Sequence, residues 1–138
     1  LRLGILATAN KEILDYIKKD IAIWNINSFA EFYMQIYNKY EADYNKTCNK
    51  FCIERVRCYK ELSSIPYLRI VPSQANYFLC EVTAKYTATE LTGNLLSAYN
   101  ILIKDCSTKK GFNRKNYIRI AIRSIEDNCK LISVLKQL

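Results

Sequence analysis

Apolar and polar residues alternate in the stretch 116–123, where isoleucines at every second position separate residues that include Arg119 and Arg123. A period of two is typical of a strand that buries one face, and the opposite face here carries two guanidinium groups. Ser124 and Asp127 then form the capping pattern S-x-x-D, which predicts that a helix begins directly after the strand. The apolar positions of this closing helix recur at helical spacing and are Ile125, Cys129, Ile132, Leu135 and Leu138.

A second pattern, from 28 to 62, places aromatic and aliphatic residues at the helical period and predicts the longest helix of the chain. Ser28 and Glu31 form a capping box at its start. An unbroken helix of this length would extend over roughly 50 Å at about 1.5 Å per residue. We therefore expect a bend or break in the polar stretch 45–49.

Shorter elements precede this long helix. Residues 1–8 are predicted as a strand, and Asn10 is a suitable N-cap for a helix over 11–19. The stretch 21–27 is expected to be an extended connector between the two helices.

After the long helix, the pattern changes to short strands. Strands are predicted over 67–71 and 76–82, and because they are joined through the short segment after Pro72, we expect them to be neighbours in one sheet. A capping box begins a helix over 87–99, and an apolar strand over 101–104 follows it.

The order of these elements predicts an α/β fold. A small sheet of about four strands, completed by the strand over 116–123, is expected to pack against the long helix and two shorter helices. The chain has 138 residues, half of them apolar, which is one domain's worth of sequence and enough to bury a core.

Charge and aromatic residues raise the possibility of a binding protein. Lysine and arginine number 21 against 13 aspartate and glutamate residues, a net charge of +8, and tyrosines line the long helix, where they could stack on nucleic-acid bases. The basic residues are scattered among acidic ones, however, and aromatic residues at helical spacing usually form a core. We expect no nucleic-acid partner, although a basic non-enzymatic interaction domain stays an open alternative.

Histidine is absent, so catalysis by Ser-His-Asp or Cys-His groups and zinc sites that contain histidine are excluded within this chain. The six cysteines form no C-x-x-C pair, and we expect reduced thiols, no metal site and a cytoplasmic location. No apolar run approaches the roughly 18–20 residues needed to cross a bilayer, so no membrane association is expected. The chain begins without methionine inside a predicted strand, which suggests a piece of a longer protein.

Five motifs, in one order, resemble segments of a known family. Leu1–Gly4 is similar to a G-L-R-L-G segment, Trp24–Ser28 to a P-W-N-V-N loop and Pro72–Leu79 to a P-S-x-A-N-F strand. Ile101–Cys106 is similar to an I-L-V-R-D-C strand, and the fifth motif is the strand that carries Arg119 with the helix after it. Together they resemble the C-terminal small domain of class I/II, fold-type I pyridoxal-phosphate aminotransferases, in the branch of histidinol-phosphate aminotransferases and threonine-phosphate decarboxylases.

The resemblance implies roles for individual residues. Arg119 matches the arginine that binds the substrate α-carboxylate, and Arg2 matches an arginine that contacts the cofactor phosphate. Trp24, Asn25 and Asn27 belong to a possible active-site loop.

Two further cations bear on the substrate. Arg123 is predicted on the same strand face as Arg119, about 13 Å away at roughly 3.3 Å per residue. It could meet a substrate phosphate or a structural carboxylate, and we favour the structural role. Lys104 departs from the family, which often has arginine there, and Ala22 stands before Ile23 where a proline usually precedes the tryptophan.

The resemblance also implies an enzyme larger than this chain. In the family, the lysine that carries pyridoxal phosphate lies upstream of the G-L-R-L-G segment, so no catalytic residue is expected here and the chain alone should be inactive. Residues 1–26 are then the end of the large cofactor-binding domain, and 27–138 are the small domain. The complete enzyme is expected to be a homodimer that transfers an amino group between an amino acid and a 2-oxo acid. Decarboxylation of a phosphorylated amino acid is the alternative activity.

Overall fold

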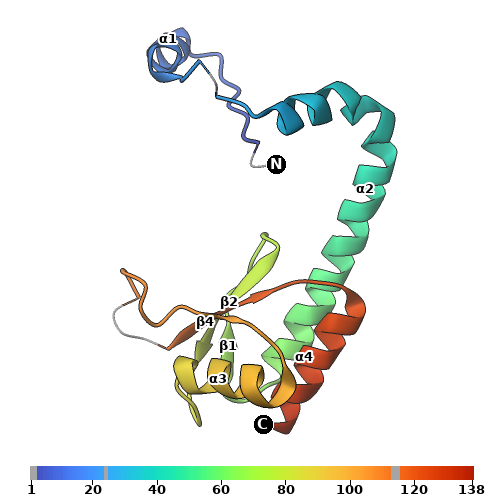
Figure 1. The fold of residues 1–138 in the computed structure, drawn as a ribbon, viewed down its shortest axis with the longest axis vertical. Coiled ribbons are helices and arrows are strands. Elements are labelled where there is room, and N and C mark those ends of the chain that lie inside the picture. Colours follow the sequence, from blue (N-terminus) through green and yellow to red (C-terminus); the bar gives the residue numbers. More distant parts are fainter. Residues whose placement is uncertain (1–2, 24, 113–115) are drawn as a thin grey trace. The chain divides into compact units, whose positions relative to one another are not determined.

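The computed structural model describes residues 3–23, 25–112 and 116–138 (Figure 1). Within these ranges the helices are α1 (Lys11–Asp20), α2 (Ser28–Ser63), α3 (Ala88–Tyr99) and α4 (Ile125–Gln137). The strands are β1 (Leu68–Ile70), β2 (Tyr77–Val82), β3 (Lys104–Asp105) and β4 (Tyr117–Ala121). The chain divides into two compact units, Leu1–Thr47 and Cys48–Leu138, and each is described by itself.

The described part of the second unit contains an antiparallel sheet with the strand order β1-β2-β4-β3. β1 and β2 are neighbours, as the sequence predicts, and pair from Leu68 opposite Val82 to Ile70 opposite Cys80. β4 pairs with β2 on one side and with the short β3 on the other. The predicted α/β fold with a four-stranded sheet is thus confirmed for the described residues.

Strand alternation divides this sheet into a buried face and an open face. Phe78, Cys80 and Ile118 on the buried face are at most 1% exposed. One hydrophobic core joins this face to the C-terminal part of α2, to α3 and to α4, which are the three helices expected there (Figure 1). The residues of β2 and β4 on the open face are Tyr77, Leu79, Glu81, Tyr117, Arg119 and Ala121.

Side-chain caps fix where three of the helices begin. Thr87 and Glu90 form the predicted capping box at α3, and Ser124 accepts the N–H of Asp127 at 3.2 Å at the start of α4. Asn10 caps α1 in the same way. Each cap satisfies a backbone donor that a helix start leaves without an intrahelical partner, so these three predictions are confirmed.

The long helix α2 differs from its prediction in two respects. Its N-cap is Asn27, whose Oδ1 accepts a backbone N–H of the first turn at 2.9 Å, and not Ser28, because the amide side chain one residue earlier already reaches that donor. The helix also continues without a break through 45–49, so of the bend or break expected there, the break is wrong. The hydroxyl of Thr47 donates to the carbonyl of Asp43 at 2.8 Å, so a polar side chain of this stretch is satisfied on the helix itself.

The observed strands are shorter than the predicted ones, and the predicted opening strand is absent from the described residues. Residues 3–8 of the expected opening strand are not in a strand, because no described strand runs beside them to supply ladder hydrogen bonds. The strand expected over 101–104 is reduced to β3, since pairing with β4 begins only at Lys104. The strand expected over 116–123 ends at Ala121.

Helix α4 confirms only part of its predicted apolar face: Ile132 and Leu135 are buried as expected, but the first two positions are not. Ile125 is 59% exposed and Cys129 is exposed as well, whereas Asn128 is buried together with the aliphatic residues that follow it. The amide of Asn128 bonds to both backbone groups of Arg123 and to the carboxylate of Glu54. These bonds set the rotation of the helix, and apolar spacing alone did not reveal them.

All six cysteines lie within the described residues and are unpaired, as predicted. Burial raises the pKa of Cys58 to about 12, with a further contribution from its hydrogen bond to Glu54, and burial also raises the pKa of Cys80 to about 12. Both groups are therefore protonated thiols at neutral pH. Among the described helices, none is long and apolar enough to cross a membrane.

Two glycines give opposite predictions for stability. Gly93 lies inside α3, where an added methyl group would meet nothing within 4 Å, whereas Gly111 has a φ of +94°. We expect Gly93→Ala to raise the free energy of unfolding of the second unit by about 0.5–1 kcal/mol, because alanine loses less backbone entropy in a helix. Gly111→Ala should lower it by about 1 kcal/mol or more. Urea unfolding measured by circular dichroism tests both, and an unchanged midpoint for Gly93→Ala would contradict the first expectation.

Candidate functional site

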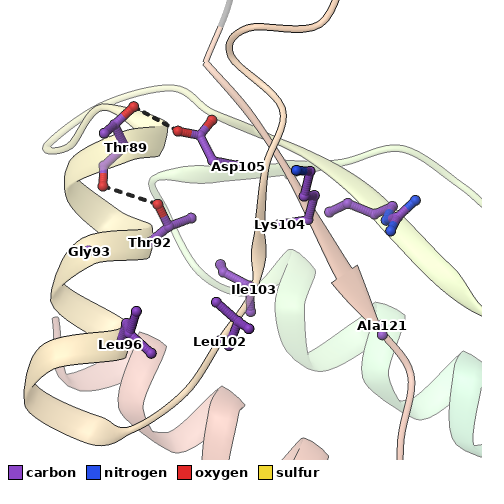
Figure 2. Close-up of a pocket in the computed structure, with 10 residues that line it drawn as sticks. Thr89, Thr92, Gly93, Leu96, Leu102, Ile103, Lys104, Asp105 and Ala121 are labelled. Carbon is purple, nitrogen blue, oxygen red and sulfur yellow. Dashed lines mark hydrogen bonds between the residues drawn. The ribbon is translucent and has the colours of Figure 1, made fainter.

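A groove of about 650 Å³ lies between α3 and the segment 102–105 and reaches Arg119 and Ala121 of β4. Figure 2 shows α3 on one side of this α3–β3 groove and the segment on the other. Asn100 ends α3 in the left-handed conformation, with a φ of 55°, and so turns the chain back alongside the helix. The groove therefore results from the tight turn that connects α3 to the edge of the sheet.

Arg119 and Lys104 occupy neighbouring positions on the open face of the sheet. They are cross-strand partners in the β3–β4 ladder, so both side chains point to the same side. Both are exposed, and within the described part of the chain neither has a carboxylate partner. Like charges directly opposite one another destabilise a sheet, and an anion bound between them would remove that cost. The pair is a candidate anion site.

Asp105 is the acidic residue of this groove, but it lies opposite Ile118, on the other side of the sheet from Arg119. Its carboxylate accepts a hydrogen bond from the Thr89 hydroxyl at 2.7 Å (Figure 2) and one from the Ser107 N–H at 2.8 Å. Burial opposes ionisation here, yet these hydrogen bonds outweigh it and lower the pKa of Asp105. The carboxylate thus connects α3 to β3 and does not neutralise Arg119.

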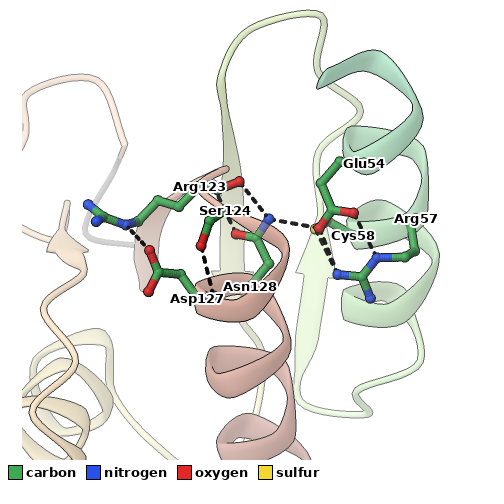
Figure 3. A network of polar contacts seen from close by, with 7 residues as sticks. All are labelled: Glu54, Arg57, Cys58, Arg123, Ser124, Asp127 and Asn128. Atoms are coloured by element: carbon green, nitrogen blue, oxygen red, sulfur yellow. Dashed lines mark hydrogen bonds and ion pairs between the residues drawn. The ribbon is translucent and has the colours of Figure 1, made fainter. Parts of the chain in front are cut away.

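Arg123 lies beyond the end of β4 and is held by the helix that follows. Its Nε donates to Asp127 Oδ2 at 2.9 Å (Figure 3). This hydrogen bond from Arg123 lowers the pKa of Asp127. Both side chains are exposed, so the pair adds little to stability. It does occupy the guanidinium of Arg123, which the sequence predicts at a substrate phosphate or a structural carboxylate.

A buried polar network connects this end of β4 to α2 (Figure 3). Glu54 accepts two hydrogen bonds from Arg57 at 2.8 and 2.6 Å, one from Asn128 at 2.8 Å and one from Cys58 at 3.2 Å. Asn128 also accepts the N–H of Arg123 at 2.9 Å and donates to its carbonyl at 3.1 Å. The network fixes the junction where the arginine strand becomes α4.

The expected active-site loop belongs to the first unit. Asn25 and Asn27 both line a small hollow of about 180 Å³, and Asn27 also caps α2. Trp24 and Arg2 lie outside the described residues.

Lys104 is a further candidate, which in the sequence stands out only as a departure from the family pattern. Its place opposite Arg119 depends on β3, an edge strand of two residues. The apolar run 101–104 predicts a longer strand and does not indicate that pairing begins only at Lys104. The sequence did contain one indication, because Lys104 keeps a positive charge where the resembling motif has arginine.

Comparison with known proteins tests the resemblance directly. The model of the family "Aminotransferase class I and II" matches residues 1–135. The chain belongs to this family. Its members depend on pyridoxal phosphate and act on small amino acid substrates, as the motifs of the sequence implied.

Individual relatives of this family come from both expected enzyme types. A histidinol-phosphate aminotransferase of Thermoanaerobacter pseudethanolicus is 32% identical over 138 residues, 100% of this chain and 37% of that protein. The threonine-phosphate decarboxylase of Salmonella typhimurium is 28% identical over 136 residues, 99% of this chain and 36% of that protein. The crystal structure of the histidinol-phosphate aminotransferase from Clostridium acetobutylicum matches with a TM-score of 0.76 and 31% identity, over 94% of this chain and 38% of that one.

The chain spans between 16% and 37% of the length of the curated relatives that it matches. It therefore corresponds to one part of those proteins.

Glu54 gives a prediction for the pH dependence of folding. The hydrogen bonds from Arg57, opposed by burial and aided by those from Asn128 and Cys58, lower the pKa of Glu54 from 4.5 to about 2. A lowered pKa in the folded state stabilises the fold above pH 4.5, and this stabilisation is lost as the pH falls through about 2. We expect Glu54→Gln to lower the free energy of unfolding by about 2 kcal/mol at neutral pH, and this difference to shrink toward acidic pH.

Urea unfolding at a series of pH values from about 7 down to 2 measures this difference. Glu61→Gln serves as the control, because Glu61 lies on the same helix and loses only an exposed ion pair with Lys136. The control should change stability much less. A difference between parent and Glu54→Gln that stays constant over the whole pH range would contradict the assigned pKa.

Proposed function

We propose that this chain is the C-terminal small domain of a pyridoxal-phosphate aminotransferase, in which Arg119 binds the α-carboxylate of the amino acid substrate. The observation that carries the proposal is the guanidinium of Arg119, without a carboxylate partner among the described residues, beside Lys104 on the open face of the sheet. The complete enzyme transfers an amino group between an amino acid and a 2-oxo acid.

Arginine suits this task better than lysine. Its planar guanidinium presents two parallel N–H groups to the two oxygens of a carboxylate. Such a pair fixes both the position and the rotation of the amino acid, and so would orient the reacting bonds of its Cα. Lys104 adds a second positive charge without that directionality.

Pyridoxal phosphate, when bound, supplies the electron sink of the reaction. Arg119 and Lys104, which have no carboxylate partner among the described residues, suit a substrate carboxylate. We assign neither of them to the cofactor itself. We propose that residues 1–26 end the large cofactor-binding domain, with Arg2 at the cofactor phosphate, and that 27–138 form the small domain of a homodimer. Trp24, Asn25 and Asn27 would then form a loop at the active site.

Decarboxylation of a phosphorylated amino acid is the second candidate activity. The similarity to the threonine-phosphate decarboxylase of Salmonella typhimurium, over 99% of this chain, favours it. Two cations side by side also suit a substrate with two anionic groups. The products separate the two activities, because the decarboxylase releases carbon dioxide and the aminotransferase releases a 2-oxo acid.

Replacement of Arg119 tests the proposed carboxylate site in the full-length enzyme. Arg119→Lys keeps the charge but loses the planar fork, so the orientation of the substrate is disturbed. We expect kcat/KM for the amino donor to fall by at least about a hundredfold, equivalent to roughly 2.7 kcal/mol of transition-state stabilisation. Cofactor binding should hardly change.

Arg123→Lys is the matched control, because Arg123 follows on the same segment but is paired with Asp127. Its effect on steady-state kinetics should be smaller. Should Arg119→Lys stay within about threefold of the parent while Arg123→Lys abolishes activity, the two roles would have to be exchanged.

A separate prediction concerns the chain in isolation. Because the lysine that carries the cofactor is expected upstream, the isolated chain should form no specific covalent adduct with pyridoxal phosphate. Borohydride reduction followed by peptide mass spectrometry measures this. Stoichiometric labelling of one particular lysine would contradict the assignment of this chain to the part without the catalytic lysine.

A further inference from the structure

Arg119 differs from the other described arginines in the kind of group that contacts its guanidinium. Arg55 donates to both oxygens of Gln74, and Arg57, Arg69 and Arg123 each donate to a carboxylate. For Arg119 the contact is an aromatic ring instead: its guanidinium carbon lies 5.1 Å from the centre of the Tyr77 ring. This distance is within the range of a cation–π interaction.

The register of the sheet explains why these two side chains meet. Tyr77 of β2 is directly opposite Ala121 of β4, and Arg119 is the diagonal neighbour two residues away on the same face. Diagonal neighbours are within reach of an aromatic ring and a long side chain. The small methyl group of Ala121 leaves space above the strand, so the Tyr77 ring is able to cover the Arg119 guanidinium.

The hydrophobic core does not account for a tyrosine at this position. Tyr77 is 38% exposed, whereas its neighbour Phe78 is 1% exposed and fills the core on the opposite face. Among the described residues, the Tyr77 hydroxyl has no hydrogen-bond partner, in contrast to the hydroxyls of Tyr67 and Tyr86. The ring itself is the part of Tyr77 that makes a directed contact.

A ring and a carboxylate engage different parts of a guanidinium. The negative face of an aromatic ring attracts the cation as a whole. A carboxylate instead binds the N–H groups at the edge, as Glu54 does with Arg57 at 2.8 and 2.6 Å. An arginine held by a ring therefore keeps its N–H donors free and its positive charge uncompensated, whereas in one held by a carboxylate the donors are engaged and the charge is balanced.

We infer that Tyr77 is a positioning residue for the substrate site: its ring holds the guanidinium of Arg119 in place while leaving its N–H donors free for the substrate carboxylate. The inference rests on the proposed role of Arg119. It adds that the aromatic ring, and not the hydroxyl group, is what the site requires at position 77.

Three replacements of Tyr77 in the full-length enzyme test this inference. Tyr77→Phe keeps the ring and should retain the parental kinetics. Tyr77→Leu removes the ring and should raise KM for the amino donor by about fivefold to thirtyfold, with a smaller change in kcat. Replacement of Tyr77 by pentafluorophenylalanine keeps an aromatic ring but removes its negative face, and it should behave like Tyr77→Leu.

Two readouts separate positioning from general damage to the fold. Cofactor affinity and the thermal midpoint should stay close to the parent in all three variants. Tyr117→Leu removes a ring from the same open face at the other end of the β2–β4 ladder, and it should leave KM within about threefold of the parent.

The outcomes distinguish this inference from the proposed function. If Arg119→Lys impairs the enzyme but pentafluorophenylalanine at position 77 matches Tyr77→Phe, the ring only fills space and the inference is wrong, while the carboxylate site stands. If Arg119→Lys itself has no effect, the proposed role of Arg119 at the substrate carboxylate is wrong, and the inference about Tyr77 falls with it. Should Tyr77→Leu fail to fold, the comparison between the two aromatic replacements still decides.

Discussion

The register between β2 and β4 is the constraint on which the rest of the second unit depends. It places Phe78 opposite Ile120 and Cys80 opposite Ile118, so these side chains share the face that the helices cover. The same register places Tyr77, Arg119 and their neighbours together on the open face. A shift by one residue would exchange the two faces and bury a guanidinium, so core packing and site assembly are selected by the same pairing.

The buried network around Glu54 secures the point where that pairing ends. Removing one partner of a buried ion pair is destabilising, but replacing the whole pair with apolar side chains is often neutral or stabilising, so stability alone does not explain why the network is polar. Its contribution is to set the direction of the chain after β4. Asn128 occupies both backbone groups of Arg123, which stops β4 from continuing and turns the chain into α4, and Glu54 connects that turn to α2.

Local patterns predicted much of this fold. The alternation that identified the arginine strand and the caps Thr87 and Ser124 depend on neighbours in sequence, and the structure confirms them. The buried face of α4 was predicted correctly at Ile132 and Leu135 but wrongly in its first turns, because a buried Asn128 has no apolar signature and its partner Glu54 is 74 residues away. The sequence also did not predict that Lys104 lies opposite Arg119 or that Arg119 contacts Tyr77. Both contacts depend on the register between strands that are separate in sequence.

The open position of Arg119 limits what this chain supplies by itself. An exposed ion pair contributes at most about 1 kcal/mol, because water competes for both partners. A hundredfold effect on catalysis requires roughly 2.7 kcal/mol, which a guanidinium on an open sheet face does not provide. Our proposal therefore requires further protein surface to exclude water from Arg119 when substrate is bound. The chain supplies the orientation of the guanidinium, and the surface that covers it would supply the low dielectric in which its hydrogen bonds become strong.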